Sequence, residues 1–132
     1  MDIPLIRRTE AQVRARRARI AAAALAQSPF LHKENFERIV EADLAMLFEL
    51  YDAEFFDGRV AAELRRRRAP LTFRLSGRMT KSAGNTAWYR PRGKARGAGR
   101  FRISIAHRLF FQSFTDDREV RVNGLPCASR LE

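Results

Sequence analysis

A run of apolar residues at three- and four-residue spacing between Phe36 and Phe55 is the strongest folding signal in the chain. It consists of Phe36, Ile39, Val40, Leu44, Leu47, Leu50, Tyr51 and Phe55. This spacing places the side chains on one face of an α-helix, with the acidic residues largely between them. The sequence therefore predicts an amphipathic helix from about Glu34 to Phe56. Asp57-Gly58 is the expected stop, because glycine tolerates the left-handed conformation that ends many helices.

Beyond this helix the apolar period changes from helical to two, which predicts β-strands. Apolar and polar residues alternate at 71–76 and again at 101–105. A further strand is expected within 81–90, where Gly84 indicates a bulge or a close approach of two backbones. A long helix followed by a small antiparallel sheet predicts an α+β fold, with the helices packed on one face of the sheet.

The two ends of the chain carry weaker signals. Residues 9–26 are rich in Ala and Arg and predict a helix, but Ala buries little area, so a mobile arm is the alternative. Toward the other end we expect a short Phe-rich helix at 106–114, a brief strand at 120–124 and the beginning of another helix from Pro126. A chain of 132 residues has room for one domain with a core. We divide it into a helical extension, residues 1–30, and a main domain, residues 31–132.

The charge is distributed unevenly along the chain. The net charge is +11, yet residues 31–58 carry two basic and eight acidic residues. Residues 59–110 carry fifteen basic residues and a single acid, Glu63. Concentrated Arg and Lys are typical of surfaces that bind nucleic-acid phosphates, although an Arg-rich composition can also follow from the base composition of a genome. Nucleic acid is therefore a candidate partner.

Two basic segments are the candidate nucleic-acid contacts. One is Arg65–Arg68, in a short helix or turn before Pro70, and the other is the glycine-rich hairpin that follows Trp88 and Tyr89. Arg and Lys on such a loop can neutralise phosphates, and an aromatic ring can stack on an unpaired base. A solvated hairpin whose Trp88 belongs to the core is the alternative. The candidate residues are Arg65, Arg66, Arg67, Arg68, Trp88, Arg90, Arg92, Lys94, Arg96, Arg100 and Arg102.

The remaining polar residues give no catalytic pattern. Cys127 is the single cysteine, which excludes an internal disulfide and a Cys-rich zinc site and fits a reducing, cytoplasmic compartment. We interpret Cys127 as a small buried side chain and Asp116-Asp117 as a solvated or capping pair. His32 and His107 are expected to be solvated or hydrogen-bonded, since a lone imidazole does not hold zinc. No apolar run approaches the ~20 residues of a membrane span, so no membrane partner is expected.

Four segments together resemble the SprT-like family of metalloproteases, which includes Spartan. Phe48–Val60 reads Phe-Glu-Leu-Tyr-Asp-Ala-Glu-Phe-Phe-Asp-Gly-Arg-Val and resembles the signature that ends the first helix of that family. Leu71–Ser76, Ser82–Gly84 and Arg102–Ile105 take the places of its next strand, its Ala-Gly segment and a following strand, in the same order. The resemblance covers about residues 35–131. It implies a zincin-like fold and, for the whole family, zinc-dependent proteolysis.

The resemblance also implies a zinc site whose residues are not in this sequence. In the family, the two His of His-Glu-x-x-His bind zinc on one helix face, a third His completes the ligand set, and the Glu is the general base. This sequence has only His32 and His107, and neither has a neighbouring Glu. We therefore expect no catalytic residue and no metal ligand here, with zinc as a cofactor only where such a helix is present. A truncated copy, a separately encoded fragment and a relative without the catalytic part remain open.

Three functions follow as hypotheses. The first is the amino-terminal scaffold of a SprT-like protease, inactive as given. The second is a basic nucleic-acid-binding module, and the third is a non-catalytic interaction domain. In the third, an exposed edge strand or an uncovered Phe-rich face would mediate self-association or bind a partner.

Overall fold

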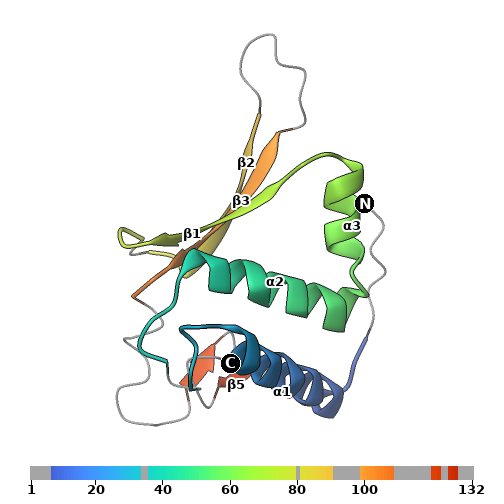
Figure 1. The fold of residues 1–132 in the computed structure, drawn as a ribbon, viewed down its shortest axis with the longest axis vertical. Helices are drawn as coiled ribbons and strands as arrows, with labels where there is room; N and C mark the ends of the chain where they lie inside the picture. Colours follow the sequence, from blue (N-terminus) through green and yellow to red (C-terminus); the bar gives the residue numbers. More distant parts are fainter. Residues whose placement is uncertain are drawn as a thin grey trace.

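The computed structural model describes residues 7–33, 36–79, 81–90, 99–108, 120–122 and 125–127. Figure 1 shows α1 and α2 stacked beneath a twisted sheet, with α3 beside it, so the fold is α+β as predicted. None of the described helices is long and apolar enough to cross a membrane. The elements are α1 (Glu10–Gln27), α2 (Glu41–Phe56), α3 (Arg59–Arg66), β1 (Leu71–Ser76), β2 (Gly84–Tyr89), β3 (Arg100–Ala106), β4 (Val120–Val122) and β5 (Leu125–Cys127).

The main sheet is mixed, with the strand order β1-β3-β2. β2 runs antiparallel to β3, with Trp88 opposite Phe101, whereas β1 runs parallel to β3, with Leu71 opposite Phe101. The prediction of an antiparallel sheet is wrong in this respect. β3 lies between β1 and β2, so β1 and β2 are not paired with each other. β1 and β3 can be parallel because the chain passes through β2 on the way and returns to the starting end of the sheet.

The register gives the sheet an apolar face and a polar face. Phe73 and Leu75 of β1 and Ile105 of β3 pack on the buried core. Phe48 of α2 contacts this face, with its ring centroid 5.8 Å from that of Phe73. The helices thus cover one side of the sheet, as the period-two pattern predicts. The buried core itself consists of Ala24, Leu31, Phe36, Ile39 and Leu44.

α2 begins at Glu41, later than the predicted Glu34. Phe36 and Ile39 are almost fully buried, with 1% and 5% of their surface exposed, but they belong to non-helical backbone before the helix. Burial at a three-residue interval imitates the helical period, which is why the sequence pattern began too early. Asp43 marks the true start, because it accepts a hydrogen bond from the Val40 N–H at 2.9 Å. Its other oxygen accepts one from the hydroxyl of Ser28, just after α1.

The end of α2 is as predicted. Asp57 and Gly58 both have positive φ, 53° and 74°, and complete the turn into α3. Gly58 is the N-cap residue of α3 and has no side chain to accept hydrogen bonds from the free N–H groups at the start of this helix. The buried carboxylate of Asp52 accepts these hydrogen bonds instead, from the N–H of Val60 at 3.0 Å and from that of Ala61 at 2.9 Å. Asp52 therefore holds two consecutive helices in a fixed relation.

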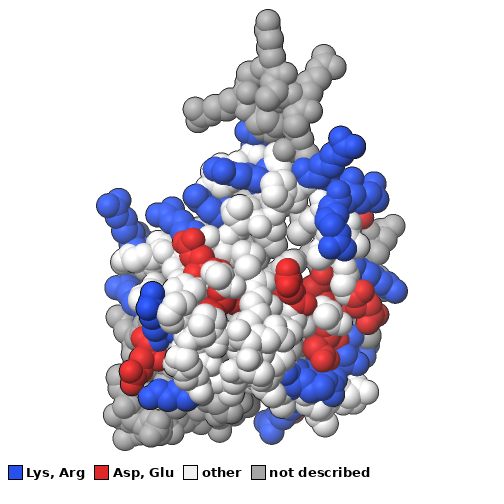
Figure 2. All heavy atoms as spheres, in the orientation of Figure 1, with Lys and Arg blue, Asp and Glu red and all other residues white. Residues whose placement is uncertain are grey.

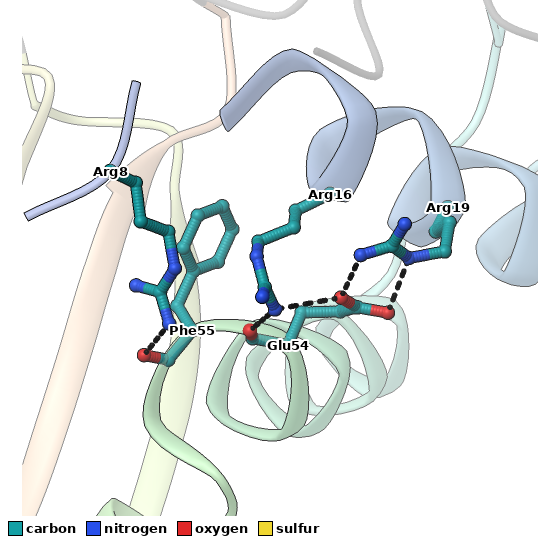
Figure 3. A network of polar contacts seen from close by, with 5 residues as sticks. All are labelled: Arg8, Arg16, Arg19, Glu54 and Phe55. Carbon is teal, nitrogen blue, oxygen red and sulfur yellow. Dashed lines mark hydrogen bonds and ion pairs between the residues drawn. The ribbon is translucent and has the colours of Figure 1, made fainter. Parts of the chain in front are cut away.

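α1 packs along α2, so the helix predicted at 9–26 is confirmed and belongs to the helical layer. Ile20 of α1 is buried, with 3% of its surface exposed. Glu54 of α2 accepts hydrogen bonds from Arg19 at 3.0 and 3.1 Å and is 3.4 Å from a guanidinium nitrogen of Arg16 (Figure 3). The hydrogen bonds from Arg19 lower the pKa of Glu54. Arg8 extends the network by donating to the backbone carbonyl of Phe55 at 3.1 Å.

The carboxyl-terminal part differs from the prediction in two respects. β4 confirms the brief strand expected at 120–124, and it pairs antiparallel with β5, Val120 lying opposite Cys127. The prediction that a helix begins at Pro126 is wrong for residues 126 and 127, because pairing with β4 holds this backbone extended. The helix predicted at 106–114 is wrong for residues 106–108, because Ala106 belongs to β3 and residues 107 and 108 form a turn after it. The rest of the helix predicted at 106–114, and residues 128–132, lie outside the described residues.

Candidate functional site

Trp88 and Tyr89 lie on opposite faces of the sheet, although they are adjacent in the sequence. Consecutive residues of a strand alternate between its two faces. Trp88 lies on the apolar face against Phe101, with ring centroids 4.5 Å apart, and keeps 45% of its surface exposed. Tyr89 lies opposite Arg100 on the polar face. The two rings therefore cannot form one stacking platform at the base of the hairpin.

Tyr89 is held by two guanidinium groups. The guanidinium carbons of Arg100 and Arg102 lie 5.1 and 4.8 Å from the centre of its ring. Arg102 also donates a hydrogen bond to the Tyr89 hydroxyl. Such cation–π contacts contribute about 0.5–1 kcal/mol each at exposed sites. They fix two positive charges on the polar face and leave less of the Tyr89 ring free to stack on a base.

The polar face of the sheet is also free of acidic residues. None of the three strands contains Asp or Glu. Arg74 and Arg100 are exposed there, and Arg102 is half-buried. In Figure 2, carboxylates gather across the middle of the molecule, where α2 lies, and Lys and Arg surround the end that carries α3 and the upper part of the sheet. We call the polar side of the sheet the basic face; its exposed and half-buried residues include Thr72, Arg74, Asn85, Tyr89, Arg100 and Arg102, and Ser104 is buried on the same side.

The four arginines of α3 and its carboxyl-terminal end fall into two pairs. Arg66 and Arg67 both bind Glu63, at 2.5 and 2.7 Å, because residues three and four positions apart meet on a helix surface. The hydrogen bonds from Arg66 and then Arg67 lower the pKa of Glu63 to about 2. Arg65 and Arg68 form no ion pair with any described residue. Within the described ranges, the tetra-arginine run therefore presents two charges without an acidic partner.

Arg65 and Arg68 border a hollow of about 390 Å³ between α2, α3 and β1. The hollow is wide open to solvent on one side, and its lining is mostly apolar. Phe48 contributes from α2, Leu64 from α3 and Leu71 from β1. The α3 hollow, as we call it, is lined by Phe48, Ala61, Leu64, Arg65, Arg68, Ala69, Pro70 and Leu71.

Arg68 has a backbone conformation that usually belongs to glycine. Its φ is +52°, in the left-handed region. The Arg68 N–H donates to the carbonyl of Arg65 at 3.0 Å, and the Ala69 N–H donates to that of Leu64 at 2.9 Å. These two bonds define a Schellman end of α3, in which the left-handed position is most often Gly. A residue with a Cβ is strained at this position.

The other predicted residues are scattered. Arg90 is exposed directly after β2, and Arg92, Lys94 and Arg96 lie outside the described residues. His32 is exposed before α2, and His107 is half-buried in the turn after β3. Across the described ranges, no group of three or more His, Cys, Asp or Glu is arranged to hold a metal ion. Cys127 lies in β5, and Asp116-Asp117 falls outside the described residues.

The α3 hollow and the role of Asp52 were not predicted from the sequence. No local pattern marks the hollow, because its walls come from three elements. Asp52 could have been found, since Gly58 leaves α3 without a capping side chain and a carboxylate one and a half turns earlier is within reach. The chain matches no protein-family model, no curated protein and no solved structure.

Proposed function

We propose that the chain forms the helix-and-sheet scaffold of a SprT-like zinc-dependent metalloprotease and is inactive by itself. The main support is that the segment resembling the family signature, Phe48–Val60, behaves as one structural unit. Phe48 packs on Phe73 of the sheet, while Asp52 fixes the turn into α3. The signature-like residues are thus those that attach two helices to each other and to the sheet, as expected of a motif that specifies a fold.

The same proposal makes the chain inactive because it lacks the chemistry of hydrolysis. A catalytic zinc needs three protein ligands and an open position for water. The sequence holds two histidines, His32 before α2 and His107 after it. Neither has a neighbouring Glu. In this proposal the scaffold supplies the fold, and a His-Glu-x-x-His helix must supply the metal and the general base.

Zinc content and protease activity test the proposal together. The purified chain is dialysed exhaustively and analysed for zinc, and it is incubated with casein in the presence of added zinc. We expect well under one equivalent of zinc and no digestion. Stoichiometric zinc retained by the chain, or digestion that a chelator abolishes, would show that the chain forms a metal site by itself.

The coding DNA that follows codon 132 tests whether the chain is part of such a protease. A frame that continues into His-Glu-x-x-His supports the scaffold, and a frame that continues without it contradicts it.

A second candidate function, nucleic-acid binding, is favoured by one observation, the basic face. Arg74, Arg100 and Arg102 lie on one side of a sheet whose strands contain no acid. Their positive charge attracts phosphates, and each contact with a phosphate releases a counterion, so binding must weaken as salt rises. A protein of this kind holds the nucleic-acid backbone without reading its sequence.

Fluorescence anisotropy with labelled single-stranded and duplex DNA, measured over a range of salt, tests this second candidate. Arg74→Gln and Arg100→Gln should each reduce the slope of log affinity against log salt by about one. Arg14→Gln is the matched control, because it removes one exposed positive charge from α1, away from the sheet. Equal losses in all three variants would mean that net charge alone drives binding. The basic face would then have no special role.

A further inference from the structure

On the apolar face of the sheet, a row of side chains leads from the α3 hollow to the edge strand β2. Leu71, which lines the hollow, lies opposite Phe101 of β3, and Phe101 lies opposite Trp88 of β2. These three side chains form a row across the sheet on the same face. We call the α3 hollow together with Phe101 and Trp88 the apolar strip. Trp88 is among the most exposed large apolar side chains of the described residues, at 45%.

Trp88 is fixed in place despite its exposure. Its ring packs on Phe101 and lies directly over Gly99. A Cβ added at Gly99 would come within 2.5 Å of Trp88 Cζ2 and 2.2 Å of the Tyr89 carbonyl oxygen. Glycine is thus required where the indole rests on the backbone. A rigid, exposed aromatic ring beside an apolar depression is typical of protein-interaction sites, in which Trp and Arg dominate the binding energy.

The positive charges at the border of the apolar strip favour a ligand that carries negative charge. Glu63, the single acid of residues 59–110, already binds Arg66 and Arg67. Arg65 and Arg68, which line the hollow, have no acidic partner among the described residues. Arg68 keeps this position although its left-handed backbone favours glycine. An occupant that brings carboxylates can bind both guanidinium groups in the bidentate manner that arginine favours.

We propose that the apolar strip binds an acidic segment of a partner protein, with one large apolar side chain in the α3 hollow and carboxylates on Arg65 and Arg68. The open shape favours a peptide over a small molecule, because small-molecule sites enclose most of their ligand. The apolar lining offers a nucleic acid few partners besides the two arginines. A second copy of this chain is disfavoured by a net charge of +11 on each copy. This inference does not depend on the proposed protease scaffold.

Anisotropy with short fluorescein-labelled peptides tests the inference on the whole chain. The first peptide carries a central Leu-Phe pair flanked by Glu. In the second, Ala replaces Leu and Phe, and in the third, Gln replaces every Glu. We expect the first peptide to bind at least about tenfold more tightly than either of the others, because each lacks one half of the recognition. Trp88 is the only tryptophan, so its emission should shift to shorter wavelength as the first peptide covers it.

Two variants locate the binding without unfolding the chain. Arg68→Gly places glycine where the backbone favours it, so the chain stays folded, and Arg65→Gln keeps a good helix former. Each variant should weaken binding of the first peptide by about fivefold or more, whereas Arg14→Gln on α1 should leave this binding unchanged. Peptide binding that is equal for the three peptides, or is unaffected by the two variants, overturns the proposal. The proposal is also overturned if both variants bind a labelled single-stranded oligonucleotide more weakly than the wild type does but bind the first peptide equally well.

Discussion

The left-handed backbone of Arg68 leads to an unusual expectation: replacing this arginine by glycine should stabilise the protein. Arg68 follows the last turn of α3 with φ +52° and is exposed without an ion pair to any described residue. Relief of the left-handed strain is worth about 1–2 kcal/mol. Glycine loses roughly 0.5–1 kcal/mol more conformational entropy on folding than alanine does. The net gain should be about 0.5–1 kcal/mol, which raises the melting temperature by roughly 3 °C in a domain of this size.

Thermal and urea unfolding, followed by far-ultraviolet circular dichroism, measure this gain. Arg68→Ala is the first control, because it removes the same charge and keeps a Cβ in the left-handed region. It should change stability little. Arg67→Gly is the second control. Arg67 has a right-handed backbone, φ −82°, and binds Glu63 at 2.7 Å, so glycine there should destabilise the chain. Two adjacent Arg→Gly substitutions are thus expected to have opposite signs.

Two outcomes would refute this reasoning. Equal stabilisation by Arg68→Ala and Arg68→Gly would mean that loss of positive charge, and not backbone strain, is the cause. Destabilisation by Arg68→Gly would mean that the conformational entropy lost by glycine outweighs the relief of left-handed strain.

Three further predictions concern other positions. Gly99→Ala should destabilise the chain by about 2 kcal/mol or more and shift Trp88 emission, because the new Cβ would lie 2.2 Å from the Tyr89 carbonyl oxygen; thermal unfolding and fluorescence measure both. Asp52→Ala should cost about 2 kcal/mol or more in urea unfolding, because the buried carboxylate accepts N–H groups from Val60 and Ala61. The depressed pKa of Glu63 should stabilise the fold above pH 4.5, and this contribution should disappear as the pH falls toward about 2. Glu63→Gln should therefore lose less stability than the wild type over that acid range; an identical pH dependence in both proteins would contradict the pairing.

Features that depend on neighbouring residues could be predicted from the sequence. Features that depend on contacts between distant residues could not. The end of α2 at Asp57-Gly58 was predictable because the turn is local. Its start was not, since Phe36 and Ile39 are buried from non-helical backbone yet keep a helical spacing. The order of the strands was also out of reach. Period two indicates that β1 and β3 have an apolar face, but it does not indicate that they pair in parallel.

In the candidate site, too, local features could be predicted from the sequence and a feature formed by several elements could not. The basic composition of residues 59–110 was evident from the sequence. That Glu63 takes up Arg66 and Arg67 follows from helical spacing and could have been predicted. The opposite directions of Trp88 and Tyr89 follow from strand alternation and could have been predicted too. The α3 hollow could not, because packing of α2, α3 and β1 creates it.

The central place of β3 has a consequence for how the protein folds. β1 is made first on the ribosome, yet in the main sheet its strand partner is β3, which follows β2. The β2–β3 hairpin closes a short loop and can form early, whereas β1 must wait for β3 to be complete. Until then, the apolar side chains of β1 can pack on the helical layer and its core but have no strand partner in the main sheet. Folding of this chain should therefore be limited by the arrival of β1 at an already formed hairpin, and a lengthened connection between β1 and β2 should slow it more than it destabilises the native state.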